Sequence, residues 1–94
     1  MALSAEARVR MERVVAAFRQ KLAAAHGSDV EWTRRYRSGD EDAMEELIAR
    51  ACAEEQIPVA EYHEALDDDA LLGELHHRSI QEVLLGAVRP SRFD

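Results

Sequence analysis

The most restrictive feature of this sequence is the helical spacing of its apolar side chains near the start of the chain. Between residues 5 and 26 these side chains recur every three or four positions, as one face of an α-helix requires. The residues on this face are Met11, Val14, Val15, Phe18, Leu22 and Ala25. At about 1.5 Å per residue the helix would be roughly 33 Å long, which is the width of a whole small domain. We therefore expect this helix to be the central element of the fold.

Composition extends the helical prediction to the rest of the chain. The 94 residues include 16 alanines but only four glycines and two prolines, a balance that favours helices over turn-rich β-sandwiches and barrels. We predict a single all-α domain over residues 1–94, folded as a compact bundle of four to five helices. The expected helices are about 5–26, 29–37, 41–55, 58–66 and 69–88, and residues 89–94 are expected to form a loose C-terminal tail.

Capping signals set the predicted boundaries. Ser28 and Glu31 have the spacing of a capping box, so Ser28 is expected to begin the second helix after the first ends at Gly27. Asp40 is expected to cap the third helix, and Pro58 suits the first position of the fourth. The aspartates at 67–69 accept free backbone N–H groups well, so we expect them to open the fifth helix.

Charge is distributed unevenly along the chain, whose formal net charge is −7. Residues 1–39 carry a balance of +4, residues 40–77 a balance of −12, and residues 78–94 a balance of +1. The acidic segment, residues 40–77, repels nucleic acid and favours basic partners, or mimics nucleic acid as an inhibitor would. The alternative is that the basic first helix covers it within the fold, or that it is simply a solvated face.

The predicted fifth helix carries two apolar clusters that point in different directions. Leu71, Leu72 and Leu75 form the first, and Ile80, Val83, Leu84, Ala87 and Val88 form the second. One stripe is enough to cover the core of a monomer, so we expect the first cluster to face the core and the second to face a partner, unless the helix is fully surrounded. The predicted interface residues are Ile80, Val83, Leu84 and Val88, with His76 at the edge.

These patterns predict a small non-enzymatic interaction module that self-associates, as a homo-oligomer, or docks on a protein partner. Cys52 lies on the apolar face of the predicted third helix, where it behaves as a small hydrophobic residue, so no catalytic nucleophile is expected. No glycine-rich phosphate loop is present, and no cofactor is expected. One metal-binding alternative remains, because Glu74 and His77 have the Glu-x-x-His spacing of di-iron helical bundles.

A nucleic-acid alternative rests on the predicted second helix. Trp32 is followed by Arg34, Arg35 and Arg37, an interleaving of aromatic and basic residues that is typical of surfaces on which bases stack. The competing interpretation is that Trp32 and Tyr36, four residues apart, anchor a short helix to the core and leave the arginines in solvent. We favour the second interpretation.

The sequence indicates a cytoplasmic protein. The first twenty residues contain six charged side chains and no apolar stretch typical of a secretion signal. The longest apolar run, residues 14–18, is far shorter than the roughly 20 residues that span a bilayer, so no membrane contact is expected. A single cysteine cannot form an intrachain disulfide. Eleven of the twelve basic residues are arginines, which with the many alanines suggests a bacterial source.

Overall fold

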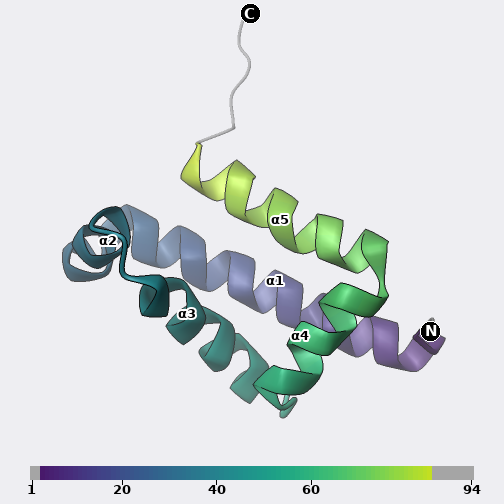
Figure 1. Ribbon diagram of the computed structural model, residues 1–94. Helices are drawn as coiled ribbons and strands as arrows, with labels where there is room; N and C mark the ends of the chain where they lie inside the picture. The colour runs from purple at the N-terminus through teal and green to yellow at the C-terminus, as the bar shows by residue number, and fades with distance from the viewer. Residues whose placement is uncertain (1–2, 86–94) are drawn as a thin grey trace, which may run out of the picture.

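The computed structural model describes residues 3–85, which form five α-helices and no strand within that range (Figure 1). The all-α bundle predicted from the sequence is confirmed. The helices are α1 (Ala5–Ser28), α2 (Val30–Arg37), α3 (Glu41–Glu54), α4 (Val59–Asp68) and α5 (Ala70–Leu84). The predicted residues 86–88 of the last helix and the predicted tail, residues 89–94, lie outside the described residues.

Helix α1 is the central element, as its length predicts. It packs against α3 and against α5, while α2 connects α1 to α3 and α4 connects α3 to α5 (Figure 1). Helix α5 runs in the same direction as α1, because Arg8 pairs with Asp69 near the start of both helices and Arg19 pairs with Glu82 further along. Helix α5 is therefore parallel to α1.

The core lies along the predicted apolar face of α1. All six residues of that face are buried, and none is more than 8% exposed. They pack with buried residues from the other four helices, among them Trp32, Leu47, Ile48, Ala51, Cys52, Tyr62, Ala65 and Leu72. Complete burial of a side chain such as Phe18 or Leu22 contributes about 1.5–3 kcal/mol to stability. The spacing that identified α1 in the sequence is therefore also the spacing that holds the bundle together.

The junction between α1 and α2 differs from the prediction. Helix α1 continues through Gly27 to Ser28, and Asp29 rather than Ser28 is the N-cap of α2. The backbone N–H of Asp29 donates to the carbonyl oxygen of Ala25 at 2.9 Å, and its carboxylate accepts from the N–H of Trp32 at 2.9 Å. Because one residue satisfies the end of one helix and the start of the next, no separate turn is needed.

The other helix ends follow the predicted chemistry with small shifts. The Asp40 carboxylate accepts from the N–H of Asp42 at 2.9 Å and caps α3, as predicted. Helix α4 extends to Asp68, so only Asp69 caps α5, where it accepts from the N–H groups of Leu71 and Leu72 at 3.1 Å. Pro58 occupies the N-cap of α4 instead of its first helical position. Within residues 3–85 no helix combines the length and the apolar composition needed to cross a membrane.

Candidate functional site

Helices α3, α4 and α5 together line a groove of about 350 Å³, which we call the α3–α5 groove. Its apolar surface comes from Met44, Ile48 and Leu66, which belong to α3 and α4. Two carboxylates and three imidazoles complete the lining with one glycine, namely Glu45, Asp67, His63, His76, His77 and Gly73. No lysine or arginine lines this groove within the described part of the chain. The groove is therefore apolar and acidic, with histidines as its only basic groups.

Gly73 shapes the end of the groove where α4 meets α5. A Cβ atom built on this glycine would lie 3.0 Å from the backbone carbonyl oxygen of Leu66. That distance is shorter than an ordinary van der Waals contact, so the absence of a side chain allows α5 to pass close to α4. The close approach places His76 and His77 beside the C-terminal half of α4.

His76 is buried between the groove and the core, with only 6% of its surface exposed. Its Nδ1 atom is 2.9 Å from the hydroxyl oxygen of Tyr62, a distance typical of a hydrogen bond. Burial, with smaller contributions from nearby His77 and His63, lowers the pKa of His76 to about 4. Burial also raises the pKa of Tyr62. Both groups are therefore uncharged at neutral pH, and His76 adds no positive charge to the groove.

The predicted interface residues lie partly in and partly beside this groove. His76 lines the groove, whereas Ile80, Val83 and Leu84 are partly buried hydrophobic residues that pack against the core. Ile80 and Leu84 follow His77 at intervals of three and four residues, so they continue the groove-lining face along α5. Val88 lies outside the described residues.

The first apolar cluster of α5 does not behave as predicted. Leu72 is fully buried, but Leu71 is 63% exposed and Leu75 is 36% exposed. The expectation that all three face the core is wrong. The physical reason is that the core contacts of α5 follow Leu72, His76 and Ser79, which are spaced by four and three residues. Leu71 and Leu75 lie on the neighbouring face, beside Arg8 of α1.

Glu74 and His77, the residues of the metal-binding alternative, are not joined by further metal ligands among residues 3–85. Glu74 forms an ion pair with Arg78, with its carboxylate oxygen 3.2 Å from Nη2, and His77 is exposed at the groove. Within residues 3–85 no three histidine, cysteine, aspartate or glutamate side chains come together in a way that suits a metal ion. Glu74 and His77 therefore remain a sequence pattern without a coordination set among the described residues.

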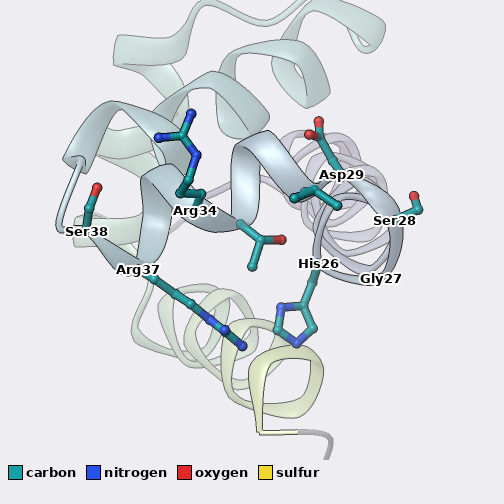
Figure 2. Close-up of a pocket in the computed structure, with 9 residues that line it drawn as sticks. His26, Gly27, Ser28, Asp29, Arg34, Arg37 and Ser38 are labelled. Carbon is teal, nitrogen blue, oxygen red and sulfur yellow. The ribbon is translucent and has the colours of Figure 1, made fainter.

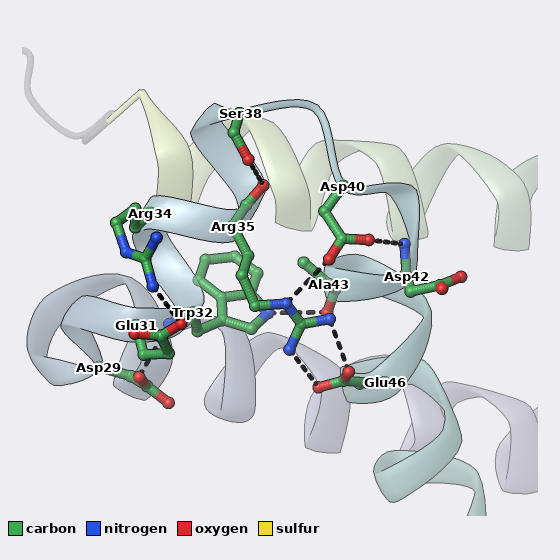
Figure 3. Close-up of polar contacts among 10 residues, drawn as sticks. All are labelled: Asp29, Glu31, Trp32, Arg34, Arg35, Ser38, Asp40, Asp42, Ala43 and Glu46. Carbon is green, nitrogen blue, oxygen red and sulfur yellow. Dashed lines mark hydrogen bonds and ion pairs between the residues drawn. The ribbon is translucent and has the colours of Figure 1, made fainter.

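Two residues of the nucleic-acid alternative, Trp32 and Arg35, hold α2 against α3 (Figure 3). Trp32 is 3% exposed, and its Nε1–H donates to the carbonyl oxygen of Ala43 at 2.7 Å. The Trp32 ring also stacks on Tyr36, with ring centroids 5.4 Å apart. A base has no access to the face of a buried indole, so Trp32 offers no stacking platform.

Ion pairs occupy two of the three arginines on α2 (Figure 3). Arg35 donates to Asp40 at 2.9 Å and to both carboxylate oxygens of Glu46, at 3.1 and 2.7 Å. The guanidinium holds the pKa of Asp40 and the pKa of Glu46 below their usual values. Arg34 pairs with Glu31, and this hydrogen bond lowers the pKa of that carboxyl group. Arg37 has no carboxylate within ion-pair distance among residues 3–85.

A second hollow lies at the corner between α1 and α2, and sequence reasoning missed it. This cavity, which we call the α1–α2 pocket, has a volume of about 580 Å³. It is lined by His26, Gly27, Ser28, Asp29, Val30, Thr33, Arg34, Arg37 and Ser38 (Figure 2). No motif signals it, because it results from the one-residue turn at Asp29. All of its lining lies within residues 26–38, but the residue pattern does not give the angle between the two helices.

The acidic segment is only partly neutralised by the fold. Helix α1 supplies two ion pairs to it, from Arg8 to Asp69 and from Lys21 to Glu54. Among the described residues, seven of its carboxylates have no histidine, lysine or arginine nitrogen within 4.0 Å. They are Glu41, Asp42, Glu55, Glu61, Glu64, Asp67 and Asp68. The basic first helix therefore does not cover the acidic segment as a whole.

Comparison with protein-family models, curated proteins and solved structures gives no match.

Proposed function

We propose that this protein is a non-enzymatic interaction module that binds a basic amphipathic helix of a partner protein in the α3–α5 groove. The observation that carries the proposal is the lining of the groove. Met44 and Leu66 provide most of the apolar contacts, since Ile48 is only 2% exposed. Glu45 and Asp67 provide negative charge, Glu45 lies 3.2 Å from Nε2 of His63, and no lysine or arginine of the described chain lines the groove. The single buried cysteine, Cys52, is consistent with a cytoplasmic location for such a module.

Helix-in-groove recognition needs apolar anchors at helical spacing and matching polar flanks. The groove offers the apolar side chains of α3 and α4 to such anchors. Ile80 and Leu84, which continue the groove-lining face of α5, extend the apolar surface toward the end of that helix. Lysines or arginines flanking the partner's apolar stripe would lie near Glu45 and Asp67.

The charge of the acidic segment favours a basic partner over a second copy of this chain. A symmetric dimer would place the same acidic face of each copy against the other, and like charges at an interface disfavour association. A basic helix is attracted instead, and the field of the unpaired carboxylates would increase its association rate. Contact with nucleic acid is disfavoured for the same electrostatic reason.

The experiment measures binding of a designed helical peptide to the purified protein by fluorescence anisotropy. The peptide carries leucines at three- and four-residue spacing with lysines on both flanks, and a matched peptide carries glutamates in place of the lysines. We expect the basic peptide to bind and the acidic peptide not to bind. The double variant Glu45→Lys/Asp67→Lys should weaken binding of the basic peptide at least tenfold.

The matched control is the double variant Asp42→Lys/Glu61→Lys, which makes the same change in net charge outside the groove lining. It should weaken binding by no more than about threefold, because only the general field is reduced. Equal losses in the two double variants would contradict a specific groove site. Light scattering on the protein alone tests whether a second copy of this chain occupies the groove instead. A stable dimer at micromolar concentration would contradict the partner helix as the occupant.

A further inference from the structure

Three residues of the α1–α2 pocket have properties that neither the packing of the core nor the α3–α5 groove explains. Val30, which lines the pocket, is 81% exposed and is the most exposed large hydrophobic residue of residues 3–85. Arg37 has no carboxylate partner among the described residues. The Nδ1 atom of His26 is buried and has no hydrogen-bond partner within residues 3–85. An apolar surface beside an unpaired cation and an unsatisfied ring nitrogen is typical of a site for a ligand with both apolar and polar parts.

We infer that the α1–α2 pocket binds a small aliphatic carboxylate, with its carboxylate group against Arg37 and its hydrocarbon part against Val30 and Thr33. Figure 2 shows Arg37 and His26 pointing toward one another, while Asp29 points to the opposite side. The two nitrogen-bearing side chains therefore define one polar end of the pocket. Its volume, about 580 Å³, is in the range of pockets that bind small molecules.

A singly charged carboxylate fits this lining better than a phosphate. A guanidinium group can donate two parallel hydrogen bonds to one carboxylate. Arg34 is paired with Glu31, whereas Arg37 has no ion pair with any residue in the described part of the chain. Asp29 also lines the pocket and would repel a doubly charged phosphate more strongly than a single negative charge. A turn of the His26 ring toward the pocket would let Nδ1, in the tautomer that carries its proton there, donate a hydrogen bond to the carboxylate, which removes an unfavourable state.

The test is an NMR titration of the full chain with hexanoate, followed through the backbone amides of Thr33 and Ser38. Hexanamide, which has the same hydrocarbon part and no charge, is the matched ligand, and inorganic phosphate is a second comparison. We expect saturable shifts with hexanoate, with a dissociation constant of about 1 mM for a ligand of this size. Hexanamide and phosphate should bind at least tenfold more weakly.

Two variants locate the charged contact. Arg37→Gln should weaken hexanoate binding at least tenfold, whereas Arg10→Gln, which removes another exposed arginine outside the pocket, should change it less than twofold. Equal affinity for hexanoate and hexanamide, or the absence of saturable shifts, would overturn the inference. The comparison of ligands uses the unaltered protein, so its result does not depend on the folding of any variant. Either outcome leaves the α3–α5 groove proposal to its own test.

Discussion

The imidazole of His76 stacks on the ring of Phe18, with the ring centroids 4.9 Å apart and the planes inclined by 14°. Phe18 belongs to the predicted core face of α1, and His76 belongs to α5, so this contact joins the two longest helices of the bundle. The same imidazole is hydrogen-bonded to Tyr62 of α4. An uncharged histidine at the centre of three helices makes the stability of the fold dependent on pH.

Acidification below about pH 6.5 should therefore destabilise the protein. The pKa of His76 is lowered from 6.5 to about 4 in the folded protein. Between these values the unfolded chain binds a proton that the folded chain does not, so stability is complete above about pH 6.5 and decreases as the pH falls toward 4. The expected total loss from this residue is about 3 kcal/mol. Urea unfolding at pH 7, 6, 5 and 4.5 measures it.

Two variants assign this pH dependence to a residue. His76→Gln should flatten the dependence of the unfolding free energy on pH, whatever its effect on stability at pH 7. His77→Gln removes the neighbouring exposed imidazole and should leave the slope nearly unchanged. If both variants keep the full slope, another group is responsible for it.

Substitution by alanine should change the unfolding free energy in opposite directions at Gly27 and Gly73. A Cβ atom on Gly27 meets nothing within 4 Å, so Gly27→Ala should raise the unfolding free energy by about 0.5–1 kcal/mol through helix propensity. Gly73→Ala brings a Cβ atom against the Leu66 carbonyl oxygen, and the resulting strain should cause a net loss of about 1 kcal/mol. Chemical denaturation followed by circular dichroism measures both. Stabilisation by Gly73→Ala would show that α4 can move away from α5 at little cost.

Trp32→Phe should destabilise the packing of α2 on α3. The substitution removes the Nε1–H donor to Ala43 and part of a fully packed ring, at an expected cost of about 1–3 kcal/mol. Tyr36→Phe is the control, because it keeps an aromatic ring in the stack and changes a residue that is 38% exposed. We expect that control to remain within about 0.5 kcal/mol of the unaltered protein. Thermal unfolding followed by circular dichroism distinguishes the two.

The two faces of α5 should differ in their importance. Leu71→Asp changes a side chain that is 63% exposed, so the unfolding free energy and the affinity for the basic peptide should both be nearly unchanged. Leu84→Asp places a charge on the partly buried face, where it should lower stability by about 1–3 kcal/mol. Equilibrium unfolding and the anisotropy assay measure the two effects. If Leu71→Asp weakened peptide binding more than Leu84→Asp, the peptide would dock on the outer face of α5 and not in the groove.

The sequence predicts the helices well because their signals are local. The spacing of Met11, Phe18 and Leu22 depends only on helix geometry, and the caps at Asp40 and Asp69 depend on neighbouring backbone groups. The error at Ser28 arose because two adjacent residues are both good caps. Local rules do not decide between them, whereas the bond from Asp29 to Ala25 does.

The candidate sites were less predictable because they depend on how helices are placed in space. The α3–α5 groove is formed by three helices, and its lining was not visible as a motif in any one of them. The direction of the first apolar cluster on α5 was predicted wrongly for the same reason. Leu71 and Leu72 are the same residue type, and only the position of the other helices determines which of them is buried. Trp32 and the arginines after it have the spacing of a binding surface, and only the fold shows that Trp32 is bonded to Ala43 and that Arg35 is bonded to Asp40 and Glu46.

The connections between the five helices contain one, three, four and one residues, since α1 ends at Ser28, α2 at Arg37, α3 at Glu54 and α4 at Asp68. Links this short leave little slack for one helix to swing away from the next. A ligand or partner would therefore meet a receptor that is already shaped, without a slow opening step before capture. Its rate of capture should then follow diffusion and ionic strength, and should be insensitive to changes in the turns.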